Sequence, residues 1–197
     1  MNQQRIAHIT RQTTETSISL QLNIDGNGNG IISTGIGFFD HMLNGFCRHG
    51  FFDMNLTLEG DLEVDSHHSV EDTGIVLGTC ISQALGDKKG INRYGHFLLP
   101  MDETLVLVAI DLSGRPYFSF DYEFTNPRVG GFDTEMVREF FYAISYSAGM
   151  NLHIKVLSGN NTHHIIEAIF KGFSKALDMA TQYNSRVDGI PSTKGIL

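Results

Sequence analysis

The feature that most constrains this chain is a short pattern of two histidines and a glutamate that occurs twice. Residues 65–74 read DSHHSVEDTG and residues 161–168 read NTHHIIEA, so HHxxE begins at His67 and again at His163. The two copies lie 96 residues apart in a chain of 197. A pattern repeated at half the chain length predicts two similar halves, each contributing the same kind of functional site.

The first half is expected to contain two strands, a helix, a third strand and a second helix. Apolar residues alternate over 18–24, and the glycine-rich segment 25–30 turns that strand back into another. Helical patterns follow over 38–49 and 66–85, each ending at a glycine, with a strand over 54–59 between them.

The second half repeats this order. LVLVAIDL at 105–112 and RPYFSFDYEF at 115–124 alternate like the strands of a hairpin, and Asp133 is expected to be the N-cap of the next helix. The remaining elements expected are a helix through 135–148, a strand over 151–157 and a closing helix over 162–183.

The order β-β-α-β-α in each half predicts an α+β fold with two mixed sheets, each covered by helices on one face. We place the first half at residues 1–92 and the second at 93–197, fused without a linker into one compact domain. The sheet faces left uncovered need another surface against them, and they are candidates to pack on each other.

Composition narrows the choice of partners and of compartment. The net charge is -8, with 22 acidic and 14 basic residues and no Lys/Arg run, which argues against nucleic acid as a partner. The strongest apolar stretch, 105–110, is far too short to span a membrane, and the polar N-terminus lacks a signal-peptide core. We therefore expect a cytoplasmic protein without a membrane partner. Cys47 and Cys80 lack CxxC spacing and are expected to be core thiols.

Both histidine pairs are expected in the first turn of a long helix. His67 and Glu71 share one helical face, whereas His68 points about 100° away, so the two histidines of a pair serve different ions. Further ligands must then come from the other repeat or from another subunit. A lone HHxxE would more often be capping or surface chemistry, but two matched copies have no simple packing explanation. Nitrogen and carboxylate ligands without thiolate suit manganese, iron or zinc.

Longer segments carry a resemblance to a known family. They are FFDHML at 38–43, DSHHSVEDTGI at 65–75, RYGHFLLPMDETL at 93–105, DLSGRPY at 111–117, NTHHIIEAIFKGFSKAL at 161–177 and PSTKGIL at 191–197. Together they resemble imidazoleglycerol-phosphate dehydratase, an enzyme of histidine biosynthesis. The resemblance runs from the TTETSI segment to the C-terminus, without an attached phosphatase module, as in the monofunctional form.

The resemblance implies two Mn²⁺ ions per active site and a homo-oligomer of about 24 subunits, in which trimer interfaces build the sites. The implied metal ligands are His41, His67, His68, Glu71, Glu139, His163, His164 and Glu167. Glu139 emerges when MNLTL at 54–58 is aligned with MNLHI at 150–154, which brings Glu139 to the position of His41 when a gap of two residues is allowed. Many relatives have histidine there, so this chain departs from that form while keeping an oxygen ligand.

The implied reaction is loss of water from D-erythro-imidazoleglycerol phosphate to give imidazole acetol phosphate. An imidazolate held by two metal ions would expel the C3 hydroxyl as a diazafulvene-like species, and an enzyme base would then take the C2 proton. Glu15 and Glu167 are the candidate bases, with Glu71 as a third catalytic carboxylate. The substrate-binding candidates are Glu15, Arg93, Arg115, Lys171, Ser192 and Lys194, the last two in a phosphate-binding C-terminal tail.

Two other functions fit the metal ligands alone. A binuclear metallohydrolase would use the same ions to activate water against a phosphate ester, and it would release phosphate from phosphomonoesters. A metal-storage shell would bind well above two ions per chain.

Overall fold

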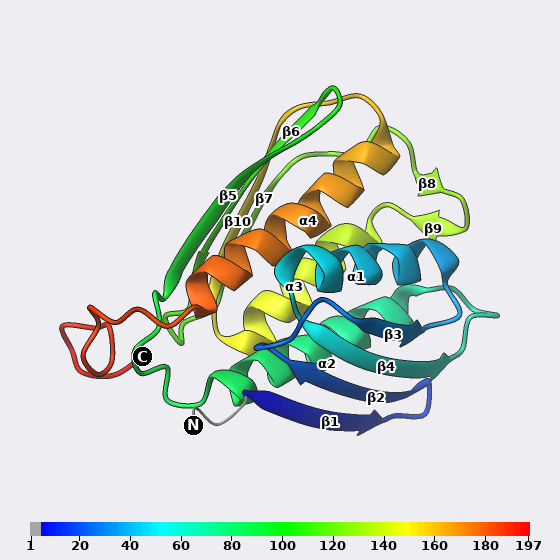
Figure 1. Cartoon of the computed structure of the whole chain (residues 1–197). Helices are drawn as coiled ribbons and strands as arrows, with labels where there is room; N and C mark the ends of the chain where they lie inside the picture. The colour runs from blue at the N-terminus through cyan, green and yellow to red at the C-terminus, as the bar shows by residue number, and fades with distance from the viewer. Residues whose placement is uncertain (1–4) are drawn as a thin grey trace.

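The computed structural model describes residues 5–197 and contains two four-stranded sheets with long helices between them (Figure 1). The first sheet has the order β1-β2-β4-β3, and its strands are β1 (Ile6–Gln12), β2 (Thr16–Asn23), β3 (Gly30–Ser33) and β4 (Asp53–Gly60). The second has the order β5-β6-β10-β7, and its strands are β5 (Tyr94–Met101), β6 (Thr104–Asp111), β7 (Tyr117–Asp121) and β10 (Asn151–Ser158). Residues 1–4 of the predicted first half lie outside the described residues.

The helices are α1 (Gly37–Gly50), α2 (His67–Leu85), α3 (Met136–Ala148) and α4 (Thr162–Thr181). The α+β class is confirmed, with two mixed sheets and helices on one face of each. Each four-stranded sheet contains one strand more than expected, because β1 and β5 precede the predicted elements. A short hairpin of β8 (Arg128–Val129) and β9 (Phe132–Asp133) leads into α3.

Both predicted hairpins are wrong. β2 and β3 are separated by β4, which pairs antiparallel with β2 and parallel with β3. In the same way β10 lies between β6 and β7, antiparallel to the first and parallel to the second. Alternation of apolar residues identifies a strand and its buried face, but it does not identify the neighbouring strand.

The expected N-cap of α3 is also wrong. The helix begins at Met136, with Glu135 in the N-cap position. Asp133 lies in β9 instead, where its carboxylate accepts a hydrogen bond from Arg128 Nε at 2.5 Å. Asp133, two residues before the N-cap residue, therefore stabilises the preceding hairpin and does not cap the helix.

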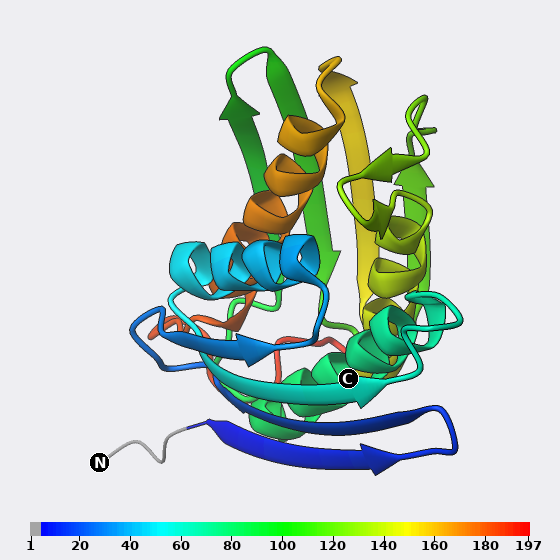
Figure 2. The same ribbon diagram turned by 90° about the vertical axis from the view of Figure 1, so that its right-hand side faces the viewer.

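The core lies among the helices and the inner sheet faces (Figure 2). α1 packs on α4, where the Phe39 and Phe170 rings lie 6.4 Å apart. α2 packs very closely on α3, and two glycines allow this approach. A Cβ at Gly74 would lie 2.7 Å from the Phe140 carbonyl oxygen, and one at Gly78 would lie 2.8 Å from that of Ile144.

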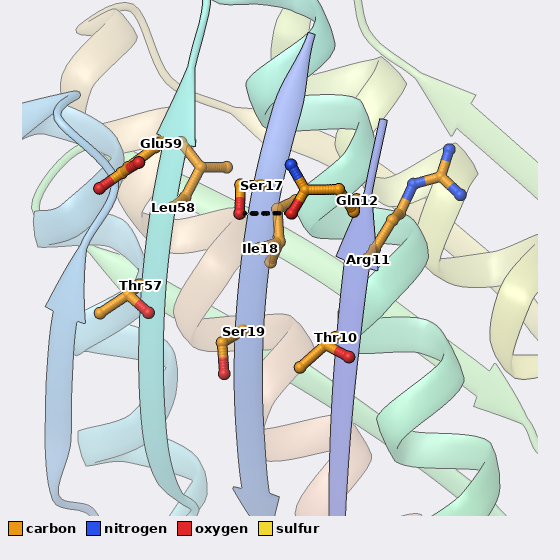
Figure 3. A pocket seen from close by; sticks show the side chains of 9 residues that line it. All are labelled: Thr10, Arg11, Gln12, Ser17, Ile18, Ser19, Thr57, Leu58 and Glu59. Carbon is orange, nitrogen blue, oxygen red and sulfur yellow. Dashed lines mark hydrogen bonds between the residues drawn. The ribbon is translucent and has the colours of Figure 1, made fainter. Parts of the chain in front are cut away.

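The uncovered sheet faces point outward, away from the helices, so they do not pack on each other as expected (Figures 1 and 2). The outer face of the first sheet is polar and includes Thr10, Gln12, Ser19 and Thr57, with a shallow pocket among them (Figure 3). The outer face of the second sheet is more apolar, and Leu98 and Leu157 are about half exposed there, at 52% and 53%.

None of the helices described between residues 5 and 197 combines the length and apolar character that crossing a bilayer requires.

Candidate metal and phosphate sites

One group of three potential metal ligands joins the two halves of the chain. His41 comes from α1, and His163 and Glu167 come from the first turns of α4. One donor atom from each lies within 4.8 Å of the others. His163 Nε2 lies 3.1 Å from Glu167 Oε2, and His41 Nε2 lies 3.8 Å from the same oxygen. Within one chain, the fold therefore brings predicted ligands from both repeats together in this group.

The local sequence explains why these side chains converge. Asn161 is the N-cap of α4, and its side-chain oxygen accepts hydrogen bonds from the backbone N–H groups of His163 and His164. His163 and Glu167 are four residues apart and share a helical face. The Phe38 ring meets the His163 ring edge-on, with centroids 5.2 Å apart, and this contact fixes the orientation of the imidazole.

Glu167 is held in its ionised form. Burial alone would raise the pKa of Glu167, but Lys171, His41 and His163 together hold it below its ordinary value. Lys171 Nζ lies 2.7 Å from Glu167 Oε1, which leaves Oε2 facing the two histidines. A charged carboxylate beside two imidazoles is a donor set that fits Mn²⁺, Fe²⁺ or Zn²⁺.

The equivalent group of the first repeat is more open. His67 Nε2 lies 3.8 Å from Glu71 Oε2 on α2, the same i,i+4 arrangement as His163 and Glu167. The predicted ligand Glu139 lies on α3, the helix packed against α2. Tyr146 first, and then Glu139 and Glu71, raise the pKa of Tyr142, so both carboxylates lie near this phenol. Within residues 5–197, the only group of three potential metal ligands with donor atoms this close together is that of His41, His163 and Glu167.

The outer histidines of the two pairs each have a carboxylate partner. His68 Nδ1 lies 3.0 Å from Asp61, and His164 Nδ1 lies 2.9 Å from Glu103. These contacts raise the pKa of both histidines, and the contact with His164 lowers the pKa of Glu103 to about 2. A carboxylate on Nδ1 orients an imidazole so that Nε2 is available to a metal.

Sequence reasoning missed Asp61 and Glu103. Both lie in segments that carry the resemblance or flank it, but only the folded chain places them against His68 and His164. Glu15, the candidate base, lies on the opposite side of the His68 ring, with Oε2 3.7 Å from Nε2.

The phosphate candidates gather in a separate pocket of about 590 Å³, lined by Arg93, Tyr94, Arg115, Pro191, Ser192, Thr193 and Lys194. Arg93 donates to Asp111 through Nε at 2.6 Å and Nη2 at 3.1 Å, and to the Pro191 carbonyl through Nη1 at 2.8 Å. One guanidinium therefore ties the C-terminal tail to the end of β6.

Lys171 lies apart from this pocket, beside Glu167. Other basic side chains lie near Lys171. Burial first, and then Lys171 and Lys175, lower the pKa of His49, so this half-buried histidine of α1 faces both lysines. His49 was not among the predicted site residues, and its position beside Lys171 could not be inferred from the sequence.

The pocket of the phosphate candidates and the candidate ligand His164 lie at opposite ends of the second sheet. Arg93 and Asp111 mark one end, whereas Glu103 and His164 meet at the β5–β6 turn at the other end. The seven strand steps from Tyr94 to Met101 correspond to roughly 24 Å. In Figure 1 the first turns of α1 and α4 lie at the upper right and the C-terminal tail at the lower left.

A family model described as imidazoleglycerol-phosphate dehydratase matches residues 34–177. The chain is 63% identical over 191 residues to the imidazoleglycerol-phosphate dehydratase of Lachnoclostridium phytofermentans, covering 97% of each chain. It is 59% identical over 189 residues to that of Acetivibrio thermocellus, covering 96% of this chain and 97% of the relative. The crystal structure of the Staphylococcus aureus enzyme, at 42% identity, covers 91% of this chain and 99% of its own with a TM-score of 0.83.

Proposed function

The chain belongs to the imidazoleglycerol-phosphate dehydratase family, and on this premise we propose that it dehydrates D-erythro-imidazoleglycerol phosphate to imidazole acetol phosphate in histidine biosynthesis. Enzymes of this family are carbon–oxygen lyases. The observation that carries the proposal is that three distant parts of the sequence meet in one pocket, which is lined by Arg93, Arg115, Ser192 and Lys194. This pocket has the donors that a phosphate monoester requires.

Phosphate binding falls mainly to Arg115 and Lys194. Both side chains are exposed at the pocket and have no ion-pair partner among the described residues. Arg93 already uses its donors on Asp111 and Pro191, so it serves to hold the tail and adds positive potential. The Ser192 hydroxyl and the turn around it complete the rim.

The metal ligands fit two Mn²⁺ ions in donor type. His41, His163 and Glu167 would hold one side of a site, and His67 and Glu71, with Glu139 nearby, would hold another. His68 and His164 offer Nε2 from rings oriented by Asp61 and Glu103. Bound cations supply Lewis-acid polarisation of the substrate's imidazole ring.

The proton step is assigned to Glu15. Its carboxylate is half exposed and beside His68, whereas Glu167 is engaged by Lys171 and His163. In the overall reaction the C3–O bond breaks, the C2–H electrons form a C2–C3 double bond, and the proton and hydroxyl leave as water. The enol then takes a proton at C3 and loses one from its C2 hydroxyl to give the ketone.

A complete site is proposed to combine several copies of the chain. Only three carbons separate the substrate's phosphate from its imidazole ring, much less than the roughly 24 Å between the two ends of the second sheet. One copy therefore cannot offer its own phosphate pocket and its own His164 to the same molecule. A homo-oligomer built from trimers, with about 24 subunits in all, is the assembly we propose.

The test is turnover of imidazoleglycerol phosphate by the manganese-loaded protein, followed through the ketone product, with free phosphate measured in parallel. We expect ketone formation without phosphate release, and loss of activity in Glu15→Gln with the metal content retained. Phosphate release without ketone would instead indicate a metallohydrolase and would refute the proposal.

A further inference from the structure

A buried carboxylate that the predicted machinery does not use lies next to Glu71 on α2. Asp72 is 7% exposed. Its Oδ1 accepts a hydrogen bond from Arg11 Nε at 2.9 Å, and its Oδ2 accepts one from Thr16 Oγ1 at 2.5 Å. Arg11 is on β1 and Thr16 is the first residue of β2, so Asp72 binds both strands of one hairpin to the helix that carries His67 and His68.

The position of Arg11 on the first sheet lets its side chain contact Asp72. It lies on edge strand β1, and its side chain extends away from the polar side chains of the outer face (Figure 3). Ala7 and Ile9 share its side of the strand and face the helices. The guanidinium therefore meets α2 at the sheet edge, where its side chain is 38% exposed and that of Asp72 is 10% exposed.

Glu15 lies in the turn that this contact holds. Thr13 and Thr16 close the turn through backbone and hydroxyl hydrogen bonds, and the Glu15 N–H donates to Thr13 Oγ1 at 3.1 Å. The Glu15 carbonyl accepts from the backbone N–H of Asp61 at 3.1 Å, and the Asp61 carboxylate contacts His68. Thr16 and Asp61 thus hold Glu15 from both sides, and Asp72 fixes Thr16.

The second half has apolar residues at the three matching positions. The 96-residue shift that superposes the histidine pairs places Ala168 at the position of Asp72. The same shift superposes β4 on β10, and the residues that pair with these two strands then correspond as well. In this way Val106 on β6 corresponds to Thr16 on β2, and Phe97 on β5 corresponds to Arg11 on β1. Ala168 and Val106 are fully buried and Phe97 packs against the same core. The fold therefore accepts an apolar triad here, and the polar one occurs in the half that carries Glu15.

Stability alone does not account for a buried carboxylate at such a place, because apolar residues of similar volume usually stabilise a core at least as well. We propose that Asp72 is a positioning residue: with Arg11 and Thr16 it clamps the β1–β2 turn onto α2 and so fixes the Glu15 carboxylate beside His68 for proton transfer. This inference rests on the proposed role of Glu15 as the base.

The test compares matched variants on substrate carrying hydrogen or deuterium at C2. Asp72→Asn and Thr16→Val each remove part of the clamp, and the triple variant Arg11→Phe/Thr16→Val/Asp72→Ala transplants the apolar triad of the second half. Asp25→Asn is the control, because it breaks the Arg5–Asp25 pair at the far end of the same two strands. Glu15→Gln reports the base itself.

We expect kcat to fall by about tenfold to a hundredfold in the three clamp variants, because a misplaced base slows proton transfer, with KM nearly unchanged. The deuterium isotope effect on kcat should rise, since proton transfer becomes more rate-limiting, while manganese content and particle size stay at wild-type values. Thr16→Ser, which keeps the hydroxyl, should restore kcat. Asp25→Asn should behave like wild type in every kinetic readout.

The outcomes separate the two proposals. Wild-type activity in Glu15→Gln would overturn the base assignment and the clamp inference with it. The clamp alone would be overturned if Glu15→Gln is inactive while Thr16→Val and the folded triple variant both show a normal kcat and a normal isotope effect. If Asp72→Asn does not fold, Thr16→Val, which retains both charged groups, still decides the question.

Discussion

Replacing Gly74 by alanine tests whether the close contact of α2 with α3 sets the geometry of the first repeat's metal ligands. The added methyl group would lie 2.7 Å from the Phe140 carbonyl oxygen and 2.9 Å from the Ala143 Cβ. Neither atom can rotate away, so α3 itself must move. Phe140 is the neighbour of Glu139, and Gly74 lies one turn after Glu71, so the displacement separates these two carboxylates.

Two opposing effects set the magnitude. Alanine is favoured over glycine inside a helix by about 1 kcal/mol, whereas overpacking a tight contact costs about 1–3 kcal/mol. The free energy of unfolding should therefore fall by up to about 2 kcal/mol in Gly74→Ala. Gly45, in α1, is the matched control because a methyl group added there would meet no atom of the described residues within 4 Å. Gly45→Ala should stabilise the protein by about 1 kcal/mol.

Denaturant unfolding at one fixed protomer concentration gives the first measurement, since assembly couples stability to concentration. Manganese titration gives the second, and we expect Gly74→Ala to bind the ion more weakly while Gly45→Ala binds it normally. Equal stabilisation of both variants, with unchanged manganese binding in Gly74→Ala, would refute the reasoning about the α2–α3 contact.

Three further predictions concern the metal and phosphate sites. Arg115→Ala should raise KM by an amount equivalent to about 2–3 kcal/mol with the metal content unchanged, measured by steady-state kinetics. His164→Ala should lose both activity and bound manganese, and metal analysis showing a full complement of ions would contradict the ligand assignment. Asp61 and Glu103 raise the pKa of His68 and His164, so protons compete with the metal for these imidazoles at a higher pH than for an ordinary histidine. Manganese affinity, measured by calorimetric titration, should therefore fall as the pH is lowered from about 8 to about 6.

The sequence predicted well what depends on local periodicity. The long helices begin and end within a few residues of their expected limits, and the HHxxE spacing places His163 and Glu167 on one face of α4. Strand neighbours could not be predicted in this way, since β4 and β10 enter the sheets between strands that are adjacent in sequence. Local alternation carries no information about which distant strand supplies the hydrogen bonds.

The candidate site was predictable to a similar extent. Histidines and glutamates in repeated motifs were identified from residue type and spacing. Glu103 and Asp72 contact residues distant in sequence, and Asp61 meets His68 only through the shape of the turn between them. A single acidic residue in a turn or on a helix is usually solvated, so nothing marks it before its partner is known. The meeting of the tail with Arg93 likewise depends on tertiary structure.

The separation of the phosphate pocket from the metal ligands has a consequence for mixed assemblies. Copies carrying Arg115→Ala would keep intact metal ligands, and copies carrying His164→Ala would keep an intact phosphate pocket. If each site draws these parts from different copies, dissociating the two inactive proteins and reassembling them together restores activity at up to roughly a quarter of the sites. A defect in one subunit is then repaired by its neighbour, as in complementation between two mutant alleles of one gene.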